Sequence, residues 1–337
     1  MNKIIDRTYM WFDDRFYILL KDEIEKAYSE GATIHPKIKD ALINGAPEVW
    51  LPSSTTILGA APKPWLADWK GRIGNEEAEK KLNEGGEKGS RVHDAIQVWT
   101  SDGMVIYNNP KKPLFTPEEL FEITKDKVEY VDYIVLREQQ EHLECWRLQQ
   151  WFKEVNPTII STEFTCVSLE NMYAGRGDLL CQIKTGIYNI NGSKPLTLPG
   201  GIYVVDYKTG KTFDKPNYYR QIGSYSNAIE ENGQYEITGG LIIHTNDNKI
   251  RGGIIEGLKT YYASKEDLSK SFEEFLKVKA VYDIDLDYQP KVIELPAILC
   301  KNPITKSAEA TSKEQTKPEK PTNGKVKKPK VIDNTFD

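Results

Sequence analysis

The sequence predicts an α+β fold with some α/β character, and three observations lead to this prediction. Apolar residues recur at helical spacing before residue 158, and β-branched residues in strand-like alternation follow it. Three successive strands, a helix and a further strand then form the order expected of an α+β protein. Hydrophobic residues make up 39% of the 337 positions and charged residues 28%, which excludes a wholly disordered chain.

The part of the chain before residue 158 is expected to be mixed, with helices dominating. The elements expected here are a helix at 18–29, an extended segment at 49–58, a short tryptophan-containing helix at 64–69, a helix at 87–100 and a longer helix at 132–154. The helix at 87–100 has a clear apolar stripe at spacings of three and four. The last helix ends at Asn156-Pro157, because the residue before a proline disfavours helical geometry.

From residue 158 onward the chain is expected to form the main sheet. The expected elements are strands at 159–168, 176–183 and 201–208, a helix at 215–231, strands at 235–244 and 250–262, and a helix at 264–282. The first three strands follow one another directly. They are therefore expected to form an antiparallel meander.

Charge and composition divide the chain further. With 45 basic against 50 acidic residues, the whole chain does not resemble a nucleic-acid-binding protein. Residues 301–337 hold nine lysines against five acidic residues and few large apolar side chains, which predicts a disordered basic tail. We expect an N-terminal accessory region at 1–85, a core at 86–300 and this tail. No apolar run approaches the roughly 18 residues needed to span a bilayer, and four scattered cysteines indicate no disulfide framework, as expected of a cytoplasmic protein.

One strand is expected to end in Val-Val-Asp-Tyr-Lys at 204–208. Because side chains alternate along a strand, Asp206 and Lys208 are expected to share one face. The residues expected to face the other layer are Tyr203, Val205 and Tyr207. A carboxylate and an amine then meet at one end of a strand. An ordinary ion pair is the alternative interpretation of so short a motif.

The preceding strand adds a second carboxylate in Gly-Arg-Gly-Asp at 175–178. If the two strands pair, Asp178 reaches the same patch as Asp206. Two neighbouring carboxylates repel each other unless a divalent cation neutralises them, so this arrangement indicates a metal site. Alternatively, Asp178 only stabilises the turn. Glu163 on the first strand is a candidate outer ligand or an ordinary strand glutamate.

Two helices carry further candidates. His93 is one of only four histidines and flanks the apolar stripe of the helix at 87–100, where its imidazole is a candidate metal ligand. A core or surface histidine is the alternative. Gln221 and Tyr225 are four residues apart on the later helix and share one of its faces. Core packing is the alternative role of Tyr225.

Taken in order, these segments resemble the RecB-like branch of the PD-(D/E)XK nuclease superfamily. The motifs that carry the resemblance are G-x-x-x-H at 89–93, G-x-G-D at 175–178, V-V-D-Y-K-T-G at 204–210 and Q-x-x-x-Y at 221–225. The earlier segment 52–58, followed by Trp65 and Trp69, is similar to phage-encoded exonucleases and to mitochondrial genome maintenance exonucleases. The resemblance covers about residues 50–245.

The resemblance implies a PD-(D/E)XK core, with a mixed central sheet flanked by helices, and a bound metal ion. His93, Asp178 and Asp206 would ligate Mg²⁺ or Mn²⁺ together with the backbone carbonyl of Tyr207. Lys208 would orient or activate the attacking water. The compact cysteine cluster of the iron-sulfur subgroup is not matched, so no iron-sulfur cluster is expected.

The resemblance also implies residues that support the lysine and the DNA. Gln221 and Tyr225 would hold Lys208 and the DNA backbone, and Arg176 and Arg91 are expected to contact DNA. A basic stretch leads into the same helix and is expected either to follow DNA or to be a solvated helix face: Lys63, Lys70, Arg72, Lys80, Lys81, Lys88 and Arg91.

Further contacts with partners are expected outside these motifs. The tryptophans Trp65, Trp69 and Trp99 are expected to stack on bases of a single strand or to pack in the core. The tail is expected to add salt-sensitive DNA affinity or to bind a replication or recombination protein.

We therefore expect a metal-dependent DNA exonuclease that acts on single-stranded DNA or free ends in replication, recombination or repair, in the cytosol of a bacterium or a phage-infected host. Two alternatives remain open. A non-catalytic DNA-binding or assembly module on the same fold would be expected to lack one of Asp178, Asp206 and Lys208, and all three are present. A structure-selective endonuclease would cut a covalently closed circle.

Overall fold

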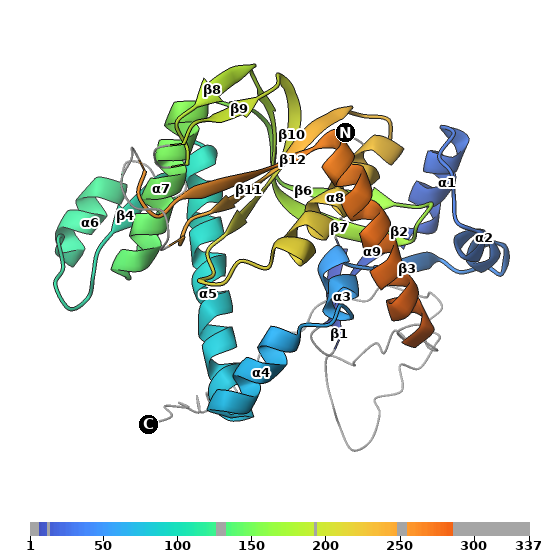
Figure 1. The fold of residues 1–337 in the computed structure, drawn as a ribbon, viewed down its shortest axis with the longest axis horizontal. Helices are drawn as coiled ribbons and strands as arrows, with labels where there is room; N and C mark the ends of the chain where they lie inside the picture. The colour runs from blue at the N-terminus through green and yellow to red at the C-terminus, as the bar shows by residue number, and fades with distance from the viewer. Residues whose placement is uncertain (1–6, 12–13, 126–132, 192–193, 248–254, 286–337) are drawn as a thin grey trace, which may run out of the picture. The chain divides into compact units, whose positions relative to one another are not determined.

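A five-stranded mixed sheet lies at the centre of the computed structural model (Figure 1). The structure describes residues 7–11, 14–125, 133–191, 194–247 and 255–285. The strand order is β12-β11-β10-β7-β6, in which only β10 (Gly201–Lys208) and β11 (Ile237–His244) run parallel. The expected antiparallel meander is confirmed, and consists of β6 (Thr158–Ser168), β7 (Tyr173–Ile183) and β10.

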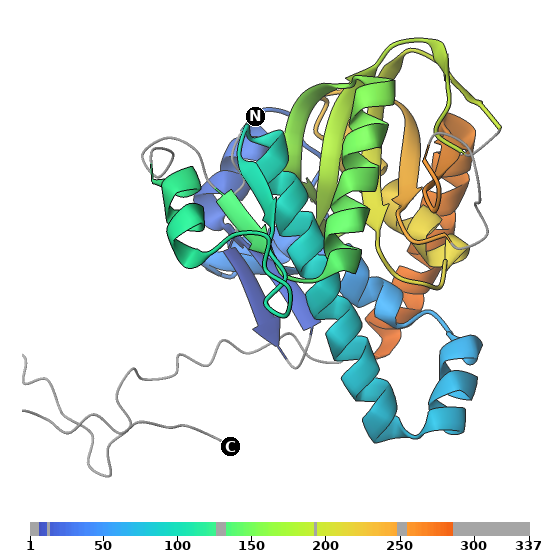
Figure 2. The same ribbon diagram turned by 90° about the vertical axis from the view of Figure 1, so that its left-hand side faces the viewer.

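Helices cover both faces of this sheet. α5 (Asn75–Thr100) and α7 (Gln139–Val155) pack on one face, and α8 (Lys215–Glu231) and α9 (Lys265–Asp285) pack on the other. Figure 2 shows α5 and α7, in cyan and green, in front of the sheet. The expected alternation along β10 is also confirmed. Tyr203, Val205 and Tyr207 enter the core under α5 and α7, and Val204 enters the core under α8 and α9.

A smaller antiparallel sheet precedes these layers. It consists of β1 (Arg7–Trp11), β2 (Asp14–Leu20) and β3 (Glu48–Pro52), with α1 (Lys21–Ser29) and α2 (Pro36–Ile43) between the last two strands. The predicted helix at 18–29 is wrong for residues 18–20, which belong to β2. Residues 16–19 are all buried, so β2 lacks the polar alternation by which a strand is recognised.

Other predicted boundaries in the N-terminal half also differ from the structure. The extended segment at 49–58 ends as a strand at Pro52, and α3 (Ser54–Gly59) follows because the Ser53 hydroxyl caps it by accepting the N–H of Thr56 at 3.0 Å. α4 (Pro64–Ile73) is slightly longer than predicted. α5 begins at Asn75 and not near residue 87, because Gly85 and Gly86 within it obscure its helical pattern.

The long helix predicted at 132–154 combines two elements. Residues of its first turn form β5 (Tyr133–Leu136), which pairs in parallel with β4 (Met104–Tyr107), and α7 begins only at Gln139. α6 (Pro117–Thr124) lies between these two strands in the chain. Propensity could not show this pairing, because the two partners are about 30 residues apart in the sequence.

The remaining elements follow the meander. β8 (Gly186–Tyr188) and β9 (Leu196–Leu198) form a small hairpin between β7 and β10. The strand predicted at 250–262 begins only at residue 259, as β12 (Lys259–Ser264), and residues 250–254 lie outside the described residues. The strand predicted at 235–244 corresponds to β11, and the helix predicted at 264–282 corresponds to α9.

The described residues of Met1–Pro290 form one compact unit. The expected boundary at residue 85 falls within α5. The expected basic tail at 301–337 lies outside the described residues. Within the described part of the chain, no helix is long and apolar enough to cross a membrane.

Candidate metal centre

Asp206 and Lys208 lie at the end of β10 on the face covered by α8. The Lys208 ammonium is 2.7 Å from Asp206 Oδ2 and donates a hydrogen bond to Gln221 Oε1 at 3.1 Å. Gln221 in turn donates from Nε2 to the Tyr225 hydroxyl at 2.8 Å, so the helix face predicted from the four-residue spacing supports the lysine. The Tyr218 ring, which the sequence analysis did not select, lies 4.8 Å from the Lys208 ammonium.

Asp178 lies where β7 and β10 separate. The pairing of the two strands ends at Val205 and Leu179, one position before Asp206 and Asp178 would face each other. Beyond that point Asp178 Oδ2 accepts the backbone N–H of Tyr207 at 2.5 Å. The carboxylate thus takes the place of a strand partner and remains at the fork between the two strands.

His93 reaches the same fork from α5. Its neighbours Val92, Ala95 and Ile96 are buried against the sheet, which turns His93 toward the end of β7. His93 Nδ1 lies 3.1 Å from Asp178 Oδ1. The predicted meeting of the imidazole with the Asp178 carboxylate is therefore present.

Glu163 completes the group from β6. The pairs on either side of it in the β6–β7 ladder place it opposite Asp178. Its φ of +47° is unusual for a residue other than glycine and stores strain in the middle of a strand, a feature that clusters at functional sites. Its carboxylate also pairs with Arg176 Nε at 2.9 Å. The sequence could not reveal this backbone conformation, which is why it identified Glu163 only as a candidate outer ligand or an ordinary strand glutamate.

The ligand atoms of His93, Glu163 and Asp178 all lie within 4.8 Å of one another. Asp206, which was predicted as a ligand, is not in this tightest group of the described residues. It is nevertheless buried, and its Oδ2 lies 2.7 Å from the Lys208 ammonium. The site cluster is defined below as His93, Glu163, Asp178, Asp206 and Lys208.

Close packing shifts the pKa values within the site cluster. Burial lowers the pKa of His93, but Asp178 outweighs burial and raises it to about 9. Burial raises the pKa of Asp206 to about 6 against the opposing effect of Lys208. Burial also raises the pKa of Glu163, and the Asp178 carboxylate adds to the shift.

The two remaining members of the site cluster keep their charges. Burial would raise the pKa of Asp178, but His93 outweighs it and lowers the pKa. Burial would lower the pKa of Lys208, but Asp206 and then Asp178 outweigh it and raise the pKa. Carboxylates whose pKa values are pushed in opposite directions are typical of functional sites.

The site cluster fits a divalent cation such as Mg²⁺ or Mn²⁺. Carboxylate oxygens are the ligands that both ions prefer, and an imidazole nitrogen suits Mn²⁺ better than Mg²⁺. Asp178 and Asp206 are both buried, and a cation would offset the repulsion between their carboxylates. Because His93 binds a metal only when neutral, binding would displace its proton.

The glycines of the sequence motifs are explained by contacts around the site cluster. A Cβ at Gly175 would lie 2.4 Å from Cε1 of the buried Tyr225, and one at Gly177 would lie 2.2 Å from Cζ of Phe164. A Cβ at Gly89 would approach the Thr209 hydroxyl to 3.2 Å. These glycines let α8, β6 and the end of β10 close around the site.

We expect Gly175→Ala to lower the free energy of unfolding by about 1–3 kcal/mol, because the new methyl group would overlap the Tyr225 ring. Gly86→Ala is the matched control, since a Cβ there meets nothing within 4 Å and alanine favours the helix by about 1 kcal/mol. Urea denaturation measures both. A Gly175→Ala variant as stable as the wild type would contradict the close packing of α8 against β7.

The arginines and lysines predicted to contact DNA are partly engaged within the protein. Arg91 pairs with the buried Glu141 at 2.8 Å, and Lys88 pairs with the buried Glu144. The earlier lysines and Arg72 lie along α4 and the first turns of α5, where most side chains are exposed. The sequence analysis did not identify the two buried glutamates, because nothing in the helical pattern marks them as buried.

The three candidate stacking tryptophans differ in environment. Trp65 on α4 is 44% exposed. Trp69 is half-buried, and no residue of α4 is fully buried. Trp99 packs edge-on against Phe152 at 5.2 Å and belongs to the core under α5 and α7. Core packing is thus the role of Trp99, whereas Trp65 is available to a ligand.

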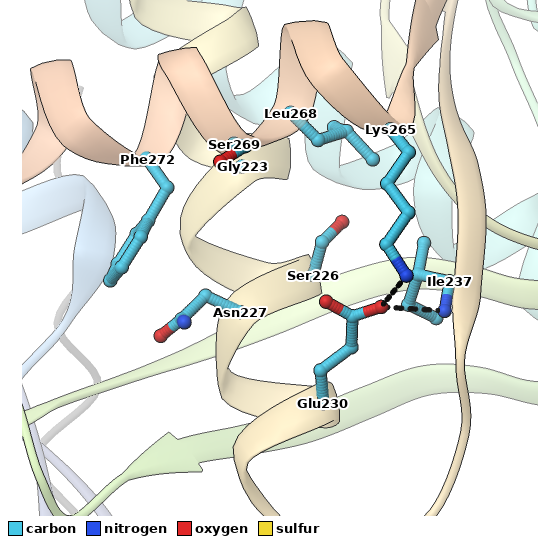
Figure 3. Close-up of a pocket in the computed structure, with 9 residues that line it drawn as sticks. All are labelled: Gly223, Ser226, Asn227, Glu230, Ile237, Lys265, Leu268, Ser269 and Phe272. Carbon is cyan, nitrogen blue, oxygen red and sulfur yellow. Dashed lines mark hydrogen bonds and ion pairs between the residues drawn. The ribbon is translucent and has the colours of Figure 1, made fainter.

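A cavity of about 130 Å³ lies between α8 and α9 (Figure 3), and no residue of the site cluster lines it. Lys265 reaches into it and pairs with Glu230 at 3.1 Å, and the same carboxylate accepts the N–H of Ile237 at 2.9 Å. The two helices approach closely at Gly223, where a Cβ would lie 2.9 Å from the Leu268 carbonyl. We interpret the cavity as a packing gap bridged by an ion pair.

Comparison with known proteins adds no identification. A scan against protein-family models found no match, and a search of curated protein sequences found none.

Proposed function

We propose that this protein is a Mg²⁺- or Mn²⁺-dependent DNA exonuclease with a RecB-like PD-(D/E)XK core. The observation that carries the proposal is the meeting of His93, Glu163 and Asp178 with ligand atoms within 4.8 Å, beside an Asp206–Lys208 pair at the end of β10. These residues come from α5, β6, β7 and β10. Chance ion pairing rarely assembles a histidine, three acids and a lysine from four elements.

The donor set assigns roles to the acidic residues. His93, Asp178 and Asp206 would hold the cation, with Glu163 close enough to take part and the Tyr207 carbonyl as an additional oxygen. When bound, the ion polarises the scissile phosphate and lowers the pKa of a water molecule. Asp178 has a second role, because it fixes both the His93 ring and the Tyr207 backbone.

Lys208 acts as a positively charged donor in this proposal. Burial would lower its pKa, but Asp206 and Asp178 outweigh burial and raise it, so the side chain carries a positive charge at neutral pH. Held by Asp206 and Gln221, it can donate hydrogen bonds to the attacking water or to a phosphate oxygen. In this role it positions the nucleophile and compensates charge.

DNA would reach the site along exposed basic and aromatic side chains. Arg176 remains partly exposed beside Glu163, and Trp65 is exposed on α4 near the start of the basic stretch. Arg91 is engaged by Glu141 but also remains partly exposed. The lysine-rich tail would add salt-sensitive affinity or bind a replication or recombination protein.

End-labelled linear DNA tests the proposal directly. Wild-type protein is incubated with single-stranded and double-stranded substrates in EDTA, Mg²⁺ or Mn²⁺, beside a covalently closed single-stranded circle. We expect loss of label from linear DNA only with a metal ion, and an intact circle. Cleavage of the circle would show that the protein is an endonuclease and not an exonuclease. No metal-dependent cleavage of any substrate would favour a non-catalytic DNA-binding module.

Metal affinity is expected to rise with pH from about 6 to 9. The pKa of His93 is raised to about 9 without metal, so binding at neutral pH must displace a proton. A raised histidine pKa contributes stability that is fully present below the ordinary value of about 6.5 and is lost as the pH rises through 9. Calorimetric Mn²⁺ titrations at three pH values, in buffers of different ionisation enthalpy, measure affinity and proton release.

The control for this pH dependence is His93→Gln, which should flatten the rise because glutamine does not titrate. An affinity that stays constant across the range in the wild type, with no proton released, would show that His93 is not a ligand.

A further inference from the structure

Glu144 on α7 is a fully buried carboxylate, with 0% of its side chain exposed. A buried charge is costly unless it is paired and hydrogen-bonded. Its Oε1 pairs with the Lys88 ammonium and accepts the Gln140 amide at 2.9 Å. Its Oε2 accepts the Thr245 hydroxyl at 3.1 Å. Both oxygens are therefore satisfied, and their partners come from three separate parts of the chain.

One of these partners leads to the helix that carries His93. Lys88 lies on α5, five residues before His93 in the chain. Its ammonium also reaches the Thr209 carbonyl at 3.4 Å, directly after β10. Gly89, the next residue, packs against the Thr209 side chain so closely that a Cβ would be 3.2 Å from its hydroxyl. This turn of α5 is thus held against the end of β10.

The other partner leads to the strand that carries Asp206 and Lys208. Thr245 follows β11, and its backbone N–H donates to the Lys208 carbonyl at 2.9 Å. Its hydroxyl, which binds Glu144, is also 3.3 Å from the same carbonyl. Arg147, one turn further along α7, donates to the Thr245 carbonyl at 2.7 Å. α7 therefore fixes the backbone at Lys208 through residue 245.

We propose that Glu144 is a positioning residue that sets His93 against Asp206 and Lys208. The imidazole and the Asp-x-Lys pair are on different elements. Glu144 binds α5 directly, through Lys88, and is linked to the end of β10 through Thr245. A displacement of about 1 Å at a reacting centre can cost a hundredfold in rate. Lys88 accordingly helps to position α5, through Glu144 and the Thr209 carbonyl, and is not part of the DNA-binding surface.

The chain provides a matched control on the same two helices. Glu141, one turn earlier on α7, is also buried and pairs with Arg91 on α5. In the described part of the chain its side chain binds no residue that follows β10 or β11. Glu141→Gln therefore removes a comparable buried charge and a comparable α5–α7 contact, but leaves the link to Lys208 intact.

The experiment compares Glu144→Gln with Glu141→Gln by Mn²⁺ titration calorimetry and by steady-state DNA cleavage. For Glu144→Gln we expect roughly 10- to 100-fold weaker Mn²⁺ binding or a kcat lower by that factor, with KM for DNA changed less than about twofold. For Glu141→Gln we expect both within about twofold of wild type. Equal behaviour of the two variants in both assays would overturn the proposal.

A second variant covers the case in which Glu144→Gln does not fold. Thr245→Val removes the hydroxyl between Glu144 and the Lys208 carbonyl but leaves the Lys88–Glu144 charges paired, so it should fold. It is expected to lower kcat several-fold without changing KM, and a kcat equal to that of the wild type would overturn the proposal. The cleavage readout rests on the proposed function. If the wild type cleaves no DNA, that function fails, and Mn²⁺ binding still decides the role of Glu144.

Discussion

Replacing Lys208 with alanine is expected to lower DNA cleavage by about a hundred- to a thousandfold while the protein remains folded. The ammonium is a donor fixed by Asp206 and Gln221 at the end of β10, and loss of one such fixed donor typically costs this factor. The fold should survive because Asp206, whose pKa is already raised to about 6, can take up a proton when its partner is removed. Single-turnover cleavage and circular dichroism measure the two effects.

Lys259→Ala is the control for this result. Lys259 is the first residue of β12 and lies at the same end of the sheet as Lys208, two strands away. It is outside the site cluster, and its ammonium lies 4.4 Å from the centre of the Tyr261 ring. It should cleave within about twofold of the wild-type rate. Wild-type cleavage by Lys208→Ala would remove the lysine from the mechanism.

Asp178→Asn is expected to abolish both metal binding and cleavage. Asp178 is the group that contacts His93, pairs with the Tyr207 N–H and lies opposite Glu163. Neutralising it removes the central charge of the donor set, and asparagine is a poorer ligand for a hard cation. In the wild type, a saturating concentration of Mn²⁺ should raise the melting temperature by mass action. In the variant this rise should disappear.

The control is Asp94→Asn, which neutralises an exposed carboxylate next to His93 on α5. Asp94 is exposed, and among the described residues it has no hydrogen bond or ion pair with the site cluster, so the Mn²⁺-induced rise in the melting temperature of Asp94→Asn should equal that of the wild type. Loss of the rise in both variants would mean that general charge, and not a built site, attracts the ion. A rise that persists in Asp178→Asn would place the ion elsewhere.

Much of this site could be predicted from the sequence because it depends on local periodicity. Alternation along one strand placed Asp206 and Lys208 on a common face, and helical spacing placed Gln221 and Tyr225 on one face of α8. For these two pairs the side-chain direction follows from the element itself. The contact between His93 and Asp178 was expected only from the family resemblance, because it depends on how α5 packs across the sheet.

The features that could not be predicted depend on backbone strain and burial. Glu163 enters the tight group because its φ is positive, and no residue pattern marks this conformation in a strand. In the sequence, Glu141 and Glu144 look like solvent-facing glutamates on an amphipathic helix. In the structure they are buried and pair with Arg91 and Lys88 of α5, about 50 residues earlier in the chain. Lysines and arginines that seemed free for DNA were therefore partly engaged.

For the fold as well, elements with clear periodicity could be predicted, and elements that depend on tertiary contacts could not. The meander and the later helices have uninterrupted periodicity and were predicted nearly as observed. The first turns of α5 were missed because Gly85 and Gly86 weaken the helical signal. β2 was mistaken for a helix start because both of its faces are buried. Tertiary contacts decided these segments.

The account depends on one ion being held between α5 and the ends of the central strands. Crystals soaked in Mn²⁺ and measured at the manganese absorption edge test this most directly. We predict an anomalous peak in contact with both the His93 imidazole and the Asp178 carboxylate. A peak that contacts neither side chain, or no peak while both are ordered, would contradict it.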